Sequence, residues 1–145
     1  MAARSWLLLA YKVPRAPTVN RVTIWRKLRR LGAMLLNDAA WVLPATPATA
    51  EQLQWLATEI KEMGGECTLW QAELLLDEQE EELIRRFHAQ VDEPYRKLLA
   101  ALKRKQADIA ALSRQYHLIH SQDYFRSDVG KQVFQALAEA RGKQR

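Results

Sequence analysis

The sequence has little cysteine and no long hydrophobic run. Its single cysteine, Cys67, cannot form an internal disulfide or supply a cysteine metal cluster, so the chain fits a reducing compartment and we expect it in the cytoplasm. The longest apolar run near the start, Trp6 to Tyr11, is far shorter than the ~20 residues that cross a bilayer, and shorter than the core of a secretory signal. We therefore expect neither a membrane span nor a signal peptide.

The composition is that of a folded protein. The chain has 145 residues, of which 48% are hydrophobic, and a net charge of +5. At ~100 to 200 residues per domain, this length predicts one domain, or a small domain with an appendage. The hydrophobic content is sufficient for a packed core and places the chain outside the disordered class.

Charge is distributed unevenly along the chain. Residues 1–50 carry +7 with Asp38 as their only acid, residues 51–93 carry −9, and residues 94–145 carry +7. Such segregation favours either binding to a polyanion or pairing of basic and acidic faces between protein molecules. Composition alone leaves both alternatives open.

The first 31 residues predict a strand followed by a helix. The apolar run Trp6 to Val13, closed by Pro14, is typical of a central strand buried on both faces. Thr18 is the predicted N-cap of an amphipathic helix that Gly32 ends. The apolar positions that we expect on its buried side are spaced three or four apart: Val19, Val22, Trp25, Leu28 and Leu31.

A hairpin is predicted next. Its strands are Ala33 to Leu36 and Ala39 to Leu43, and Asn37-Asp38 have the residue types of its turn.

A second helix and a fourth strand follow the hairpin. Thr49 and Gln52 have the spacing of a capping box, and Gly64-Gly65 end the helix. The predicted buried positions of this helix are Leu53, Leu56, Ile60 and Met63. Cys67 to Leu76 alternates in the manner of a strand.

The resulting order, β-α-β-β-α-β over residues 1–76, predicts an α+β fold with a ferredoxin-like core. Two helices would cover one face of its antiparallel sheet, and the other face needs a cover, from the remaining chain or from a second subunit.

Residues 77–145 predict a helical extension that packs on the core or on a second subunit. Three-four spacing runs through Leu83, Phe87, Val91, Tyr95, Leu98 and Leu102, and resumes at Ile109, Leu112, Tyr116 and Ile119. Pro94 should end or bend the first of these helices. Ser127 is a predicted cap for a last helix whose apolar positions are Val129, Val133, Phe134 and Leu137.

Several motifs resemble the amino-terminal domain of ChrB, a family of chromate-resistance regulators. The motifs are Tyr11-Lys12-Val13-Pro14-Arg15, Trp25-Arg26-Lys27-Leu28 with Arg30-Leu31-Gly32, the run DAAWVLP from Asp38 to Pro44, and downstream Arg85-Arg86-Phe87, Val91, Tyr95 and Asp123-Tyr124-Phe125. More distantly, the strand-helix-hairpin segment resembles the middle domain of the PaaX repressor and the ferredoxin-like fold of the CRISPR adaptation nucleases.

This resemblance implies transcription regulation and a homodimer. Family members also carry a second, carboxyl-terminal domain, which we expect to be absent here and which a separate chain could supply.

Five basic residues of the first helix form a candidate DNA-binding surface: Arg21, Arg26, Lys27, Arg29 and Arg30. Such a stripe suits phosphate contacts, which give affinity without sequence information. The alternative is a solvated helix face.

The entry to the same helix is a candidate anion site, made of Arg15, Thr18, Asn20 and Arg21. A helix N-terminus and arginine side chains favour a tetrahedral dianion such as chromate or sulfate. The alternative is a capped helix whose arginines face water.

We expect no enzymatic activity, no cofactor and no metal site. The related nucleases place an acid at the end of the first strand to hold a divalent cation, whereas Lys12 at that place would repel one. The spacing of His117, His120 and Asp123 could suit a metal ion. We interpret the two histidines instead as ordinary surface residues. Cys67 is interpreted as a small buried hydrophobe and the five tryptophans as core anchors.

The sequence therefore predicts a cytoplasmic regulatory module that binds DNA and responds to chromate or a related oxyanion. One alternative is a protein-interaction module in which the seam from Val91 to Ile119 pairs with a second copy or a partner. A metal-dependent nuclease is the third hypothesis, since the fold permits it.

Overall fold

The computed structural model describes residues 4–36 and 40–143. The chain divides into two compact units, Met1–Asp77 and Glu78–Arg145, close to the boundary between residues 76 and 77 drawn from the sequence. Within the described ranges, every helix is too short or too polar to cross a bilayer.

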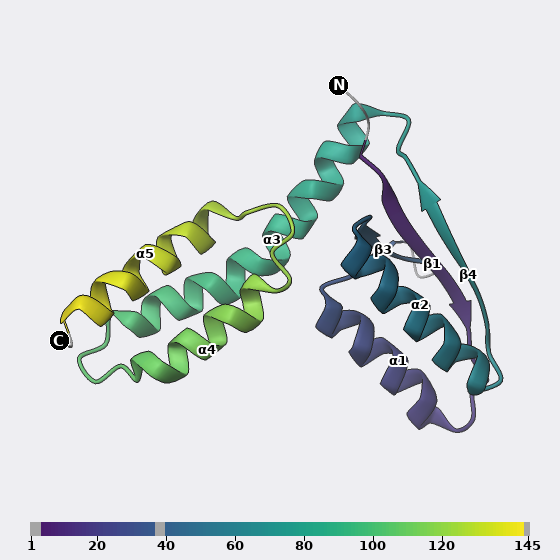
Figure 1. Ribbon diagram of the computed structural model, residues 1–145, viewed down its shortest axis with the longest axis horizontal. Helices are drawn as coiled ribbons and strands as arrows, with labels where there is room; N and C mark the ends of the chain where they lie inside the picture. Colours follow the sequence, from purple (N-terminus) through teal and green to yellow (C-terminus); the bar gives the residue numbers. More distant parts are fainter. Residues whose placement is uncertain (1–3, 37–39, 144–145) are drawn as a thin grey trace. The chain divides into compact units, whose positions relative to one another are not determined.

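The first unit is a four-stranded antiparallel sheet with two helices on one of its faces (Figure 1). In chain order its elements are β1 (Trp6–Lys12), α1 (Thr18–Leu31), β2 (Met34–Leu36), β3 (Ala40–Pro44), α2 (Pro47–Glu62) and β4 (Glu66–Ala72). The strand order is β2-β3-β1-β4. This arrangement confirms the predicted α+β class and the ferredoxin-like core.

β1 is the central strand, as predicted, and its register defines the two faces of the sheet. Leu9 lies opposite Trp41 of β3 and Leu69 of β4, so these three side chains share one face. The Cys67 Sγ on the same face of β4 donates a hydrogen bond to the Ala57 carbonyl of α2 at 3.6 Å. That face therefore lies under the helices.

The hairpin between β2 and β3 is confirmed, with Leu35 paired to Trp41. Its predicted turn at Asn37-Asp38 lies outside the described residues. β4 ends at Ala72, so the predicted extension of this strand to Leu76 is wrong.

Both N-caps predicted in the first unit are wrong. The N-cap of α1 is Pro17, which makes no side-chain cap, and Thr18 is already helical. The N-cap of α2 is Thr46, whose Oγ1 accepts a hydrogen bond from the Thr49 backbone N–H at 3.0 Å. Pro47 follows as the first helical residue, where its missing N–H costs nothing. Thr49 is therefore the third helical residue, and Gln52 has no part in the capping box.

The buried side of α1 also differs from the prediction. Ile24 and Leu28 are buried, whereas Val19, Val22 and Trp25 are 64%, 38% and 49% exposed. Two apolar stripes with helical spacing overlap at Leu28, and only the one through Ile24 faces the core. In α2, by contrast, the predicted positions Leu53, Leu56 and Ile60 are buried.

The second unit contains three helices, and the first of them begins at the last residue of the first unit. They are α3 (Asp77–Leu102), α4 (Ile109–His120) and α5 (Asp128–Lys143). Their shared core consists of Val91, Tyr95, Leu98, Leu112, Tyr116, Val133 and Leu137. The seam predicted to pair with a second chain thus packs within this one.

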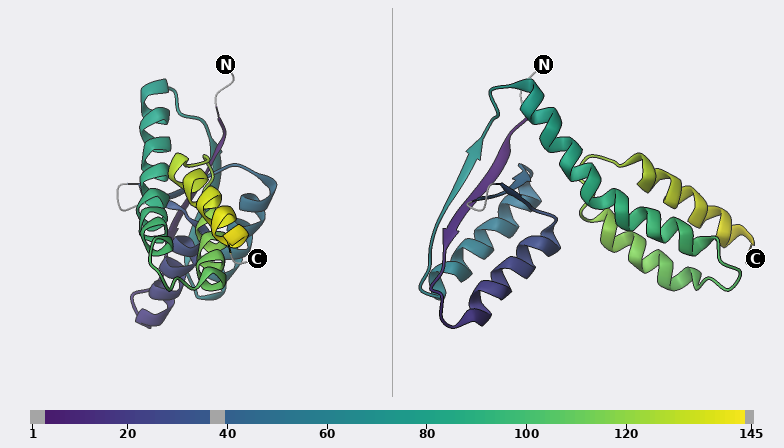
Figure 2. Two further views of the ribbon diagram at one scale, coloured as in Figure 1. Left: turned by 90° about the vertical axis from the view of Figure 1, so that its left-hand side faces the viewer. Right: turned by 180° about the vertical axis from the view of Figure 1, so that it is seen from behind.

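Three local predictions for the second unit can be compared with the structure. α3 runs through Pro94, so the helix does not end there; its ribbon changes direction partway along, as in the alternative of a bend (Figure 2). Ser127 caps α5 as predicted, because its Oγ accepts a hydrogen bond from the Gly130 backbone N–H at 3.1 Å. Phe134, placed among the buried positions, is 59% exposed.

Gly65 allows the turn after α2 to approach the end of β1. A Cβ at this position would lie 2.6 Å from the Lys12 carbonyl oxygen and 2.9 Å from the Val13 Cγ1. We expect Gly65→Ala to lower the free energy of unfolding of the first unit by about 1–3 kcal/mol, because backbone has to move. Tryptophan fluorescence during urea unfolding reports on this unit alone, since all five tryptophans lie before residue 77.

The matched control is Gln54→Ala on the exposed side of α2, for which we expect a change within about 0.5 kcal/mol. Equal unfolding midpoints for the two variants would contradict the close approach.

Candidate functional site

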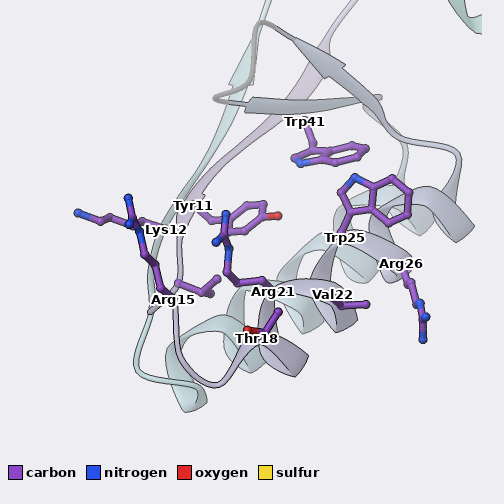
Figure 3. A pocket seen from close by; sticks show the side chains of 10 residues that line it. Tyr11, Lys12, Arg15, Thr18, Arg21, Val22, Trp25, Arg26 and Trp41 are labelled. Carbon is purple, nitrogen blue, oxygen red and sulfur yellow. The ribbon is translucent and has the colours of Figure 1, made fainter.

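A pocket of about 690 Å³ opens beside α1 on the helix-covered side of the sheet (Figure 3). Its wall combines the end of β1, the loop that follows, the exposed flank of α1 and one residue of β3. The ten residues that line it are Tyr11, Lys12, Val13, Arg15, Thr18, Arg21, Val22, Trp25, Arg26 and Trp41.

Three aromatic side chains come to this pocket from three elements. Trp41 of β3 pairs in register with Leu9, and Tyr11 lies two residues further along β1, so both rings project from the same face of the sheet. Trp25 faces them from α1, and Figure 3 shows the two indoles close together with the Tyr11 ring beside them. Trp41 is buried, whereas half of the Trp25 side chain is exposed to solvent.

Four cations also line the pocket: Lys12, Arg15, Arg21 and Arg26. None of the ten described lining residues is acidic. In Figure 3 the Arg21 side chain points toward the Tyr11 ring, and Arg15 lies at the same end of the pocket, whereas Arg26 points away from it. The positive charge inside the pocket is therefore concentrated at the Arg15–Arg21 end.

The pKa of Tyr11 is shifted by this environment. Burial raises the pKa of the Tyr11 phenol above its ordinary value of 10.0, because desolvation disfavours the phenolate. A hydrogen bond with Trp41 and the positive charge of Arg21 oppose this rise. Tyr11 is thus a neutral hydrogen-bonding group at physiological pH, held next to a cation.

Three of the four residues predicted to form an anion site line this pocket. Arg15, Thr18 and Arg21 contribute to its wall, whereas Asn20 does not. Since Thr18 is the first helical residue rather than the cap, its backbone N–H lies at the start of α1, where the i−4 carbonyl partner of a helix is missing. The predicted anion site is thereby one end of a larger pocket.

The predicted DNA-binding residues lie on two flanks of α1. Arg21 and Arg26 belong to the pocket side, and the Arg29 guanidinium lies 5.4 Å from the centre of the Trp25 ring, a cation–π distance. Lys27 forms an ion pair with Glu59 of α2. Arg30 shares a shallow hollow with this pair. Arg21, Arg26, Arg29 and Arg30 are exposed.

Sequence reasoning missed the aromatic part of the pocket. The prediction that the tryptophans are core anchors is right for buried Trp6 and Trp41. It is wrong for Trp25, Trp55 and Trp70, which are exposed. The available signal was the second apolar stripe of α1, Val22 and Trp25, which runs beside the stripe that reaches the core.

Asp123 and His120, two of the three residues with possible metal spacing, make structural contacts. Asp123 accepts a hydrogen bond from the Tyr95 hydroxyl at 3.0 Å and another from the Ser127 backbone N–H at 3.0 Å. His120 stacks on Tyr116, with ring centroids 5.4 Å apart. Among the described residues, no three histidine, cysteine, aspartate or glutamate side chains are grouped as metal ligands.

Comparison with known proteins identifies one family. The family model described as "Protein ChrB, N-terminal" matches residues 21–122, which extend from α1 to the end of α4. A relative named Protein ChrB, from Cupriavidus metallidurans (strain CH34), is 35% identical over 78 residues. The aligned region covers 54% of this chain and 24% of the relative's length. No solved structure matches the chain.

The pocket electrostatics predict a pH dependence. Because Arg21 lowers the pKa of Tyr11, Arg21→Gln should raise that pKa further. The measurement is an ultraviolet tyrosinate titration of the folded protein, compared with the same titration of Tyr11→Phe to isolate the Tyr11 signal.

The sign of the linkage follows from the raised pKa. The folded state holds the Tyr11 proton more tightly than the unfolded chain, so this contribution to stability is present below about pH 10 and is lost as pH rises through the folded pKa. A Tyr11 pKa that Arg21→Gln lowers or leaves unchanged would contradict the proximity of the two groups.

Proposed function

The chain belongs to the ChrB family through its amino-terminal domain, and we propose from this that it is a chromate-resistance regulator module that binds DNA with the basic surface of α1. The observation that carries the proposal is the charge of this helix. α1 has five basic residues and no acidic one, and four of them, Arg21, Arg26, Arg29 and Arg30, are exposed.

Physical chemistry makes such a surface a phosphate binder. Each Lys or Arg that neutralises a phosphate releases condensed counterions, and this term supplies affinity without sequence readout. The guanidinium groups of Arg29 and Arg30 lie in the last turn of α1. Sequence preference would have to come from other contacts, such as those of a second copy in a homodimer.

A response to chromate or a related oxyanion is the second part of the proposal. Arg15 and Arg21 at one end of the pocket offer charge-assisted hydrogen bonds, and the start of α1 adds backbone N–H donors. Occupation of this end would change the charge beside the DNA-binding surface, since Arg21 is common to both.

The two alternative functions have less support. The seam of the interaction hypothesis is buried within the second unit, so a homodimer or partner would use a different surface. The nuclease hypothesis would need carboxylates near the end of β1, where Lys12 and Arg15 line the pocket instead.

The test is a DNA-binding titration by fluorescence anisotropy. The probes are the duplex upstream of the protein's own gene and an unrelated duplex, each at several salt concentrations. We expect affinity to fall steeply with salt, and Arg29→Gln/Arg30→Gln to reduce the slope of log K against log salt by about 2, roughly one for each lost phosphate contact.

The matched control is Arg96→Gln/Arg114→Gln, which removes the same charge from exposed positions of α3 and α4. An equal loss in this control would indicate a general charge effect and contradict the role of α1. Absence of binding to both duplexes at low salt would refute DNA binding altogether.

The oxyanion response is tested in the same titration. Chromate should weaken binding to the upstream duplex more than an equal ionic strength of chloride does. Arg15→Gln should abolish this difference while duplex binding without chromate persists, because Arg15 is outside the proposed DNA-binding set. Equal effects of the two anions would contradict a specific oxyanion site.

A further inference from the structure

The geometry of the pocket beside α1 points to an organic ligand of nucleotide type: a planar ring held against Trp25 and Trp41, and a phosphate held by Arg15 and Arg21. This inference does not rest on duplex binding, although it extends the oxyanion site of the proposed function to a larger ligand.

Size is the first argument. The pocket volume of about 690 Å³ falls within the ~300 to 1,000 Å³ typical of sites for small organic molecules. A bare tetrahedral oxyanion has one central atom and four oxygens, so it would occupy only the end between Arg15 and Arg21. The rest of the pocket would stay filled with water against aromatic walls.

The aromatic walls are the second argument. Trp25 is 49% exposed on a helix whose other exposed positions are mostly polar, so its position is not explained by the packing of the core. Tyr11 and Trp41 present further aromatic surface from the sheet. Stacking of a base on such rings contributes affinity and requires no particular base, since every base has a π face.

The separation of charge from aromatic surface is the third argument. Figure 3 shows Arg15 and Arg21 at the Tyr11 side of the pocket, and the Trp25 and Trp41 indoles on the other side. A ligand that satisfies both ends carries an anionic group at one end and a planar ring at the other. A nucleotide has this form, with a ribose between its two parts.

Hydrogen bonding adds a polar contact between the two ends. The Tyr11 hydroxyl stays protonated at physiological pH because burial raises its pKa, so it can donate to a ligand oxygen. Together with Arg21 it provides donors close to the proposed phosphate position.

Two sources offer the same chemistry. A free mononucleotide and an unpaired nucleotide of single-stranded DNA both present a base and a phosphate, and basic grooves with aromatic platforms bind either. The experiment separates these sources by ligand length.

The experiment is isothermal titration calorimetry of the full chain with adenosine 5′-monophosphate, adenosine, ribose 5-phosphate, sulfate and a short single-stranded oligonucleotide. We expect the nucleotide to bind at least about 10-fold more tightly than adenosine, ribose phosphate or sulfate. Trp25→Ala should weaken nucleotide binding about 10-fold or more, in line with the loss of one stacked ring. Trp25→Phe should restore most of the affinity.

The matched control is Trp55→Ala, which removes another exposed tryptophan, 65% exposed against 49% for Trp25, from α2 outside the pocket. Its nucleotide affinity should equal that of the unchanged protein. Arg21→Gln tests the phosphate end: it should reduce the preference for the nucleotide over adenosine while leaving adenosine binding unchanged.

The outcomes are distinct. Binding that depends on Trp25 supports the inference, whether both the mononucleotide and the oligonucleotide bind or the oligonucleotide binds alone. Binding of the oligonucleotide alone identifies the source of the ligand as nucleic acid. Sulfate binding as tight as nucleotide binding, no binding of either nucleotide probe, or equal losses in Trp25→Ala and Trp55→Ala would overturn it. Duplex binding measured in the same buffer shows separately whether the proposed function fails.

Discussion

The antiparallel pairing of β1 with both β3 and β4 is the constraint on which the first unit depends. It places β1 in the middle of the sheet and fixes which side chains face the helices. Leu9 is fully buried under the helices. Because side chains alternate along a strand, Tyr11 projects from the same face two residues later. β1 ends directly after Tyr11. On the face that the helices cover, the side chains therefore change from apolar to polar near the segment that leads into α1. The pocket occupies this transition.

Much of the fold could be predicted from the sequence because hydrophobic periodicity and turn residues are local signals. The order of elements along the chain followed from the change between strand-type and helix-type apolar spacing, and the buried positions of α2 from one clear apolar stripe. The starts of α1 and α2 could not be placed, because Thr18 and Thr49 look like caps in isolation whereas the N-caps are Pro17 and Thr46. The pocket was only half predicted: arginines near a helix start are visible in the sequence, but the approach of Trp25 to Trp41 depends on how α1 is rotated on the sheet.

The rotation of α1 follows from competition between two stripes of similar apolar character. Ile24 and Leu28 offer branched aliphatic side chains that fit among the side chains of the sheet, and both are completely buried. Trp25 belongs to the other stripe and stays half exposed, with the Arg29 guanidinium 5.4 Å from the centre of its ring. A substitution that changed this balance would alter the binding surface without touching any proposed ligand contact.

The ion pair between Lys27 and Glu59 has a consequence for the electric field around α1. It neutralises a cation on the flank that faces α2, while Arg21 and Arg26 on the opposite flank line a pocket whose described walls carry no acid. The electrostatic potential around α1 is therefore asymmetric and is more positive on the side of the aromatic rings. Long-range electrostatic attraction favours the approach of an anion to that flank rather than to the flank that faces α2.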